Sequence, residues 1–335
     1  MNITGVPDLL SNQRFRNIES SLSRQLEAAG LELTTGQHAD VNKAAGGDLR
    51  RLYVLEAGVA SENAFKDAAT RAGARLETAL NSVEMIRNST DGLAIDITAA
   101  VERGDTATAE RVAASSRSTF GAAVQSLNTR YAGRSLFAGA EVNSPALPPS
   151  EDILTAAFAS IAGAPDAATA RGMLEDFFLS PTGGYEASMY QGDDATTRMQ
   201  VNDGVYLALE PNALDIPFRQ ALFGLALSAA VVEGEIGTTA EERTTSLGAA
   251  AQALLDAQPG LLDISADLGG LTEQANTAVS EAGDMRLQLE LNLSDILSVD
   301  PYEAASRLTG LQGALEAALT VQSMTRNLSF VRFIQ

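Results

Sequence analysis

The sequence has no cysteine and only one histidine, His38. The missing cysteines exclude disulfide bonds, thiolate metal sites and cysteine nucleophiles, and a single histidine excludes a histidine-rich metal site. His38 lies in a polar, glycine-flanked stretch, so we interpret it as an exposed loop residue. No phosphate-binding loop, nucleophile elbow or metalloprotease motif occurs. The best ion-binding candidate, Asp193-Asp194, lacks the alternating oxygen ligands of a calcium loop. We therefore expect a protein that is not an enzyme, with no catalytic, cofactor-binding or metal-binding residues.

Aromatic residues make up only 5% of the chain, tryptophan is absent, and no apolar run is long. The longest, Ala221–Val232, is well short of the ~20 residues that span a membrane, so it predicts a buried helix. The start, Met1–Ser11, has neither the basic residues nor the apolar run of a secretory signal. The net charge of −20 disfavours binding to nucleic acid or to an anionic membrane surface.

Alanine and leucine dominate instead, and their spacing predicts long helices near both ends of the chain. A helix over 49–103 would be ~80 Å long. From Phe65 it carries apolar residues in alternating steps of four and three: Phe65, Ala69, Ala72, Leu76, Ala79, Val83, Ile86, Thr90, Leu93, Ile97 and Ala100. A similar pattern runs from Ile264 to Val299. Such heptads are typical of coiled-coil packing.

The segment 143–204 differs, because prolines, glycines and acidic residues interrupt short helical and strand-like patches. We therefore predict a mainly α protein. Its N- and C-terminal segments form a long helical bundle or coiled coil with a small inserted mixed α+β head domain. The predicted parts are an N-terminal helical half (1–142), the head (143–204) and a C-terminal helical half (205–335).

Finer patterns give local predictions. Gly30 is a plausible helix stop, followed by an extended stretch over 31–36, and 185–190 is strand-like. The segments 198–201 and 205–209 also read as strands. Thr239–Glu242 is typical of a capping box before a helix over 247–255, with a further helix from Ile264.

The terminal helices carry the candidate assembly interface. Near the N-terminus one stripe is formed by Phe15, Ile18, Leu22 and Leu26. After the helix start at Asp300-Pro301, two successive stripes follow on different faces: Leu308, Leu311, Leu315 and Leu319, then Val321, Met324, Leu328 and Val331. We interpret the first of these faces as packing on the chain's own N-terminal helix, and the second as the surface for a neighbouring subunit or a chaperone.

Three stretches resemble one family. They are the segment Arg130–Gly139 with its Leu136-Phe137-Ala138-Gly139, the head motif Tyr190-Gln191-Gly192-Asp193, and the C-terminal segment from Leu289 to Gln335. All three are similar to the hook-associated protein 3 family, the flagellin-like junction proteins of the bacterial flagellum. Both four-residue motifs favour the junction proteins over flagellin itself.

The resemblance implies a structural role at the hook–filament junction, outside the cell, after export without a cleaved signal peptide. The implied partners are hook-associated protein 1, flagellin, other copies of the chain, and a cytoplasmic export chaperone at the C-terminal helix; neither nucleic acid nor membrane insertion is expected. Two alternatives stay open: a minor flagellin of the filament, and a secreted helical tip or translocator protein of a type III secretion system.

Overall fold

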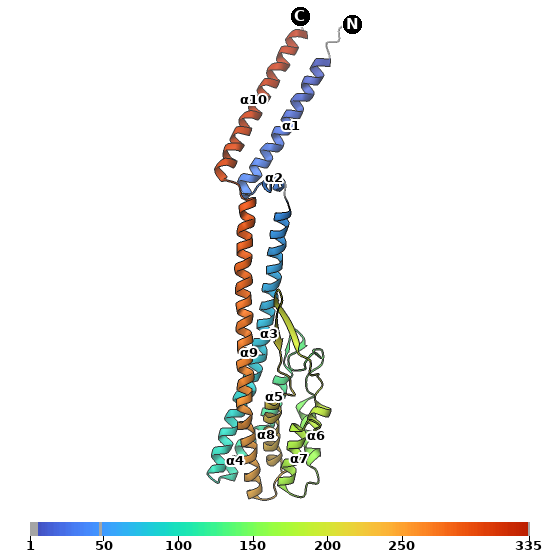
Figure 1. Ribbon diagram of the computed structural model, residues 1–335, viewed down its shortest axis with the longest axis vertical. Coiled ribbons are helices and arrows are strands. Elements are labelled where there is room, and N and C mark those ends of the chain that lie inside the picture. Colours follow the sequence, from blue (N-terminus) through green and yellow to red (C-terminus); the bar gives the residue numbers. More distant parts are fainter. Residues whose placement is uncertain (1–5, 47–48, 334–335) are drawn as a thin grey trace. The chain divides into compact units, whose positions relative to one another are not determined.

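A computed structural model describes the backbone of residues 6–46 and 49–333, and the side chains of residues 13–46 and 49–324. The described chain is mainly α-helical, as the sequence predicts (Figure 1). Its helices are α1 (Val6–Thr35), α2 (Val41–Ala44), α3 (Leu49–Glu102), α4 (Thr106–Ala113), α5 (Ser116–Leu127), α6 (Ser150–Ile161), α7 (Ala167–Leu179), the π-helix η1 (Tyr185–Met189), α8 (Ile216–Glu233), α9 (Ala240–Leu297) and α10 (Pro301–Phe333). Two antiparallel hairpins complete it: β1 (Arg130–Tyr131) with β2 (Arg134–Ser135), and β3 (Thr197–Asn202) with β4 (Val205–Leu209).

The chain divides into two compact units. Unit 1 comprises Met1–Asn63 and Asp284–Gln335, and unit 2 is the continuous segment Ala64–Gly283. Both boundaries fall within a helix, so α3 and α9 each contribute residues to both units. The β3–β4 hairpin lies within unit 2 and spans residue 204, where the sequence analysis ends the head domain.

In unit 2, α3 and α9 run antiparallel and side by side. Gly73 lies against Ala275, Val101 lies against Gly248, and between them Gln258 donates a 3.0 Å hydrogen bond to Thr90 Oγ1. The α3 heptad residues from Ala69 to Ala100 are buried, while Phe65 is half-buried. The heptad prediction for α3 is therefore confirmed.

Helix α8 is the centre of unit 2, and it packs against α4, α5, α6 and α7. Of its 18 residues, 13 are buried on all sides of the helix. Among the helices that the structure describes, α8 has the length and composition to cross a membrane, but 72% of that stretch is buried inside the protein. This burial agrees with the core helix predicted from the apolar run over 221–232.

One arginine is buried in the α8 core with its charge compensated. Arg219 is only 4% exposed, and it forms a 3.0 Å ion pair with Glu186. Its guanidinium also donates to the carbonyl oxygens of Phe178 and Ser180. A buried charge is tolerated when it is paired and hydrogen-bonded in this way.

Several local predictions are wrong. Residues 31–35 continue α1, because Glu32 is buried there and forms an ion pair with Arg307 on α10. The segment 185–189 is a π-helix, since Tyr185 is fully buried and its hydroxyl donates to the Ala213 carbonyl oxygen. In both places tertiary packing overrides the local pattern.

The two C-terminal helices predicted over 247–255 and from Ile264 are one helix, α9. It continues through Pro259, although proline in a helix interior costs ~3 kcal/mol. Leu254, Ala257 and Leu261 are buried on either side of the proline, and this burial offsets the cost.

The capping box is confirmed: Glu242 N–H donates to Thr239 Oγ1, and Thr239 N–H donates to the Glu242 carboxylate. The strands over 198–201 and 205–209 are confirmed as parts of β3 and β4.

Candidate functional site: an assembly interface

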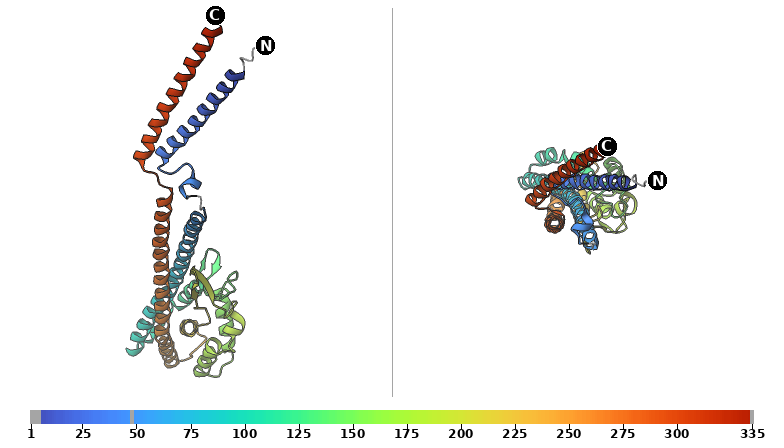
Figure 2. Two further views of the ribbon diagram at one scale, coloured as in Figure 1. Left: turned by 45° about the horizontal axis from the view of Figure 1, so that its top comes forward. Right: turned by 90° about the horizontal axis from the view of Figure 1, so that it is seen from above.

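Helices α1 and α10 of unit 1 pack against each other (Figures 1 and 2). On α1 the predicted residues Phe15, Leu22 and Leu26 are half-buried. On α10 the half-buried set is Leu308, Leu311, Leu315 and then Ala318. The spacing of three and four residues on both helices is that of faces that pack on one another. Two helices alone cannot enclose these side chains, so the leucines keep contact with solvent.

The other predicted interface residues lie on exposed parts of the two helices. Ile18 on α1 is 48% exposed, and on α10 Leu319 is 44%, Val321 49% and Met324 60% exposed. Leu319 therefore belongs with the second stripe rather than the first, since Ala318 takes the half-buried position. The side chains of Leu328 and Val331 lie outside those that the structure describes.

A buried ion pair fixes the base of the α1–α10 pair. Glu32 is 7% exposed, and its carboxylate accepts a 2.8 Å bond from Arg307 Nη1 and a 3.2 Å bond from the Ala39 amide. Arg307 also binds Glu303 one turn earlier on α10. Sequence reasoning missed this contact, because it read the Glu32 segment as extended. The opposite charges at positions 32 and 307 gave no signal that they would meet.

Backbone bonds join the ends of α1 and α9 at the same place. Gln37 and Ser298 form a β-bridge, His38 N–H donates to the Leu297 carbonyl oxygen, and Val299 N–H donates to that of Gly36. Gly36, directly after α1, has φ +69°. Glycine adopts this left-handed conformation without a steric penalty, and the conformation ends the helix. The start of α10 is therefore anchored to the end of α1.

Unit 1 exposes further large apolar side chains that the sequence analysis did not select. Tyr53 and Val54 on α3 are 61% and 65% exposed, and Leu287 and Leu291 on α9 are 53% and 59% exposed. Leu287 and Leu291 lie one turn apart on one face of α9. These two leucines could have been selected from the sequence, because they are apolar but lie outside the heptad positions of α9. Apolar residues off the packed face of a helix need a second surface to cover them.

The charge is distributed unevenly between the units. Unit 1 has ten Lys and Arg against fourteen Asp and Glu, a net charge of −4. Unit 2 has thirteen against twenty-nine, a net charge of −16. Copies of unit 2 therefore repel one another strongly, whereas copies of unit 1 repel one another only weakly.

The two motifs that carry the resemblance bind each other in unit 2. Asp193 N–H donates to the Ala138 carbonyl oxygen, and Asp193 Oδ1 accepts a 2.6 Å bond from the Ala140 amide. Thr197 Oγ1 donates to the Gly139 carbonyl oxygen. The Tyr190 hydroxyl donates to the Asp193 carbonyl oxygen and closes the turn. The Asp193 carboxylate is thus a structural acceptor for backbone amides.

Glycines allow this close approach from both sides. A side chain at Gly139 would collide with Asp193, and one at Gly192 would meet Tyr190 and the Ala138 carbonyl oxygen. Gly139 also has φ +66°, which favours glycine. The glycine in each motif is therefore required by the contact with the other motif.

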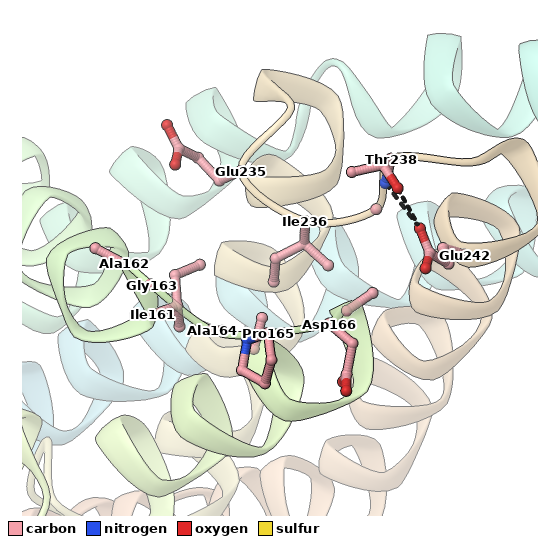
Figure 3. A pocket seen from close by; sticks show the side chains of 13 residues that line it. Ile161, Ala162, Gly163, Ala164, Pro165, Asp166, Glu235, Ile236, Thr238 and Glu242 are labelled. Carbon is pink, nitrogen blue, oxygen red and sulfur yellow. Dashed lines mark hydrogen bonds between the residues drawn. The ribbon is translucent and has the colours of Figure 1, made fainter.

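The cavity between the α6–α7 and α8–α9 connections has a volume of about 250 Å³ (Figure 3). Figure 3 shows Glu242 directed toward Thr238, to which it is hydrogen-bonded. Glu242 also accepts from the Thr239 amide and Asp166 accepts from the Thr169 amide, and these bonds lower the pKa of both carboxyls. Both groups therefore cap helices. Within the described residues, no three His, Cys, Asp or Glu side chains gather to hold a metal ion.

The fold is shared with a solved structure. That protein, described as a flagellar hook-associated protein from Vibrio parahaemolyticus, matches 74% of this chain and 96% of its own length. The TM-score is 0.51 and the sequence identity is 13%, so the likeness is one of fold. No protein-family model and no curated protein matches the sequence.

Proposed function

We propose that this chain is a structural subunit of the bacterial flagellum that forms the junction ring between hook and filament. The observation that carries the proposal is the α1–α10 pair, whose apolar faces are half-buried or exposed within unit 1. Each apolar side chain left in water forgoes ~1.5–3 kcal/mol of burial. The shared fold with a flagellar hook-associated protein supports a flagellar setting for that assembly.

The distribution of charge supports different roles for the two units, with unit 1 in assembly and unit 2 in contact with solvent. Unit 1 combines a small net charge with exposed Leu319, Met324 and Leu287, so it suits close packing with other copies. Unit 2, with its net charge of −16, suits a position facing solvent. The terminal helices then form the assembly core, and unit 2 includes the head.

The proposed partners follow from this arrangement. Copies of the chain would form the ring, with hook-associated protein 1 on one side of it and flagellin on the other. Before export a cytoplasmic chaperone would cover the exposed stripe of α10. The Leu-Phe-Ala-Gly and Tyr-Gln-Gly-Asp motifs, which contact each other in unit 2, resemble those of junction proteins rather than those of flagellin, and this resemblance supports the junction role.

Deletion of the gene tests the proposal in the parent bacterium. We expect hooks without filaments and flagellin monomers in the medium, with filaments restored by the full-length gene. The measurement is electron microscopy of cells together with immunoblotting of the medium. Filaments that stay attached in the deletion strain would contradict the junction role, and purified protein that extends into long filaments by itself would indicate a minor flagellin. Intact flagella together with lost delivery of effector proteins would indicate a type III secretion tip.

A further inference from the structure

Three arginines surround one cavity in unit 2. Arg71 and Arg75 lie one turn apart on α3, and Arg134 lies on β2. Tyr131 on β1 and Met199 on β3 line the same cavity, which has a volume of about 300 Å³. In Figure 1 the strands of this region lie beside α3. Three cations, two from α3 and one from β2, thus line one space in a strongly acidic protein.

Arg75 is the unusual member of the group. It is 7% exposed, and its Nε and Nη2 atoms are buried with no hydrogen-bond partner among the described residues. Burial and the neighbouring charge of Arg134 lower the pKa of Arg75. A buried guanidinium without acceptors carries a desolvation cost. Arg75 also lines the cavity, so an anion there would offset part of this cost by electrostatic attraction.

Three other arginines of unit 2 are paired with carboxylates. Arg117 pairs with Glu151 and Glu233, Arg219 pairs with Glu186, and Arg243 pairs with Glu110. Within the part of the chain that the structure describes, neither Arg71, Arg75 nor Arg134 forms an ion pair. Unit 2 has more than two acidic residues for each basic one, yet none of the residues that line this cavity is acidic.

We propose that this cavity is a binding site for a carboxylate group on a short apolar stem. The positive charge of Arg75 would attract the carboxylate from the wall of the cavity. Arg71 and Arg134, both exposed, would add attraction at the rim. Ala72 and Met199 give the cavity an apolar wall for the stem of the ligand.

Two kinds of molecule can supply such a carboxylate group. One is a glutamate or aspartate side chain of another copy of the chain, since each copy carries 43 acidic residues. The other is a free organic acid. The site follows from the residues of the cavity, and it holds whether or not the chain belongs to a flagellum.

Thermal unfolding of the full-length protein with glutarate as the probe tests the site, and glutaramide is the neutral control. We expect a saturable rise in Tm with glutarate but none with glutaramide, because a ligand that binds the folded state stabilises it. Arg75→Met removes the buried cation and should abolish the rise; Arg71→Gln, at the exposed rim, should weaken it. Arg198→Gln is the matched control, since Arg198 is exposed on β3 and is not among the residues that line the cavity.

Sedimentation with and without glutarate separates the two sources. If a second copy occupies the cavity, glutarate and Arg71→Gln both reduce self-association; if a free acid does, sedimentation stays the same while Tm rises. Equal Tm responses to glutarate and glutaramide, or equal glutarate responses in wild type, Arg71→Gln and Arg198→Gln, would overturn the proposal. Arg71→Gln keeps this test decisive even if Arg75→Met does not fold.

Discussion

Gly133 and Gly139 show how two glycines with the same backbone conformation can have different roles. Both have positive φ values, +79° and +66°. A side chain at Gly133 would enter open space, whereas one at Gly139 would collide with Asp193. Gly133 is therefore required only by its backbone conformation, and Gly139 also by the contact between the two motifs.

Alanine substitution separates these two requirements. We expect Gly133→Ala to lower the free energy of unfolding by about 1 kcal/mol, the cost of a left-handed alanine. Gly139→Ala should cost at least ~2 kcal/mol more, because the backbone of the Asp193 turn must also move. Urea unfolding of the full chain, followed by circular dichroism, measures the difference. Equal losses in the two variants would show that the motif contact does not constrain Gly139.

Local stability should differ sharply between elements. Helix α8 has 13 buried residues, whereas the described side chains of α1 include only Ala29 and Glu32 as buried, and those of α10 only Ala304. Segments with little buried surface open with a low free energy. In the dilute monomer the amides of α1 and α10 should therefore exchange much faster than those of α8.

Leu315→Asp tests the role of the α1–α10 pair. Because Leu315 is half-buried on the packed face of α10, a carboxylate there should separate the pair and abolish assembly. Thr309→Asp, at an exposed position of the same helix that belongs to neither stripe, is the control and should assemble normally. Hydrogen–deuterium exchange should show faster exchange in α1 and α10 and unchanged protection in α8. Normal assembly of the Leu315→Asp protein would refute the assigned interface.

The elements could be predicted where one pattern is repeated many times. The heptads of α3 predicted a buried face correctly, because every turn repeats the same constraint. Single contacts between distant residues could not be predicted: Glu32 with Arg307, and Tyr185 with the Ala213 carbonyl oxygen. Each of these contacts decided the local conformation. The cluster of Arg71, Arg75 and Arg134 was hidden for the same reason, since α3 and β2 are far apart in sequence.

For the whole molecule, the division into units separates folding from assembly. Unit 2 is one continuous segment with its own core around α8, while unit 1 is built from both ends of the chain. Unit 2 also carries a net charge of −16, which opposes self-association. The segment that folds most firmly is thus the one least suited to pack with copies of itself.

A chain trimmed to residues 64–283 tests this separation. We expect a cooperatively folded monomer, because a segment of this size can bury enough surface for an independent core. It should stay monomeric at concentrations where the full chain assembles, and also at high salt, where screening removes the repulsion between its charges. Thermal melting followed by circular dichroism checks folding, and sedimentation velocity checks association. A trimmed chain that assembles as the full chain does would place the interface in unit 2, whereas an unfolded one would show that the terminal helices are needed for folding as well as for assembly.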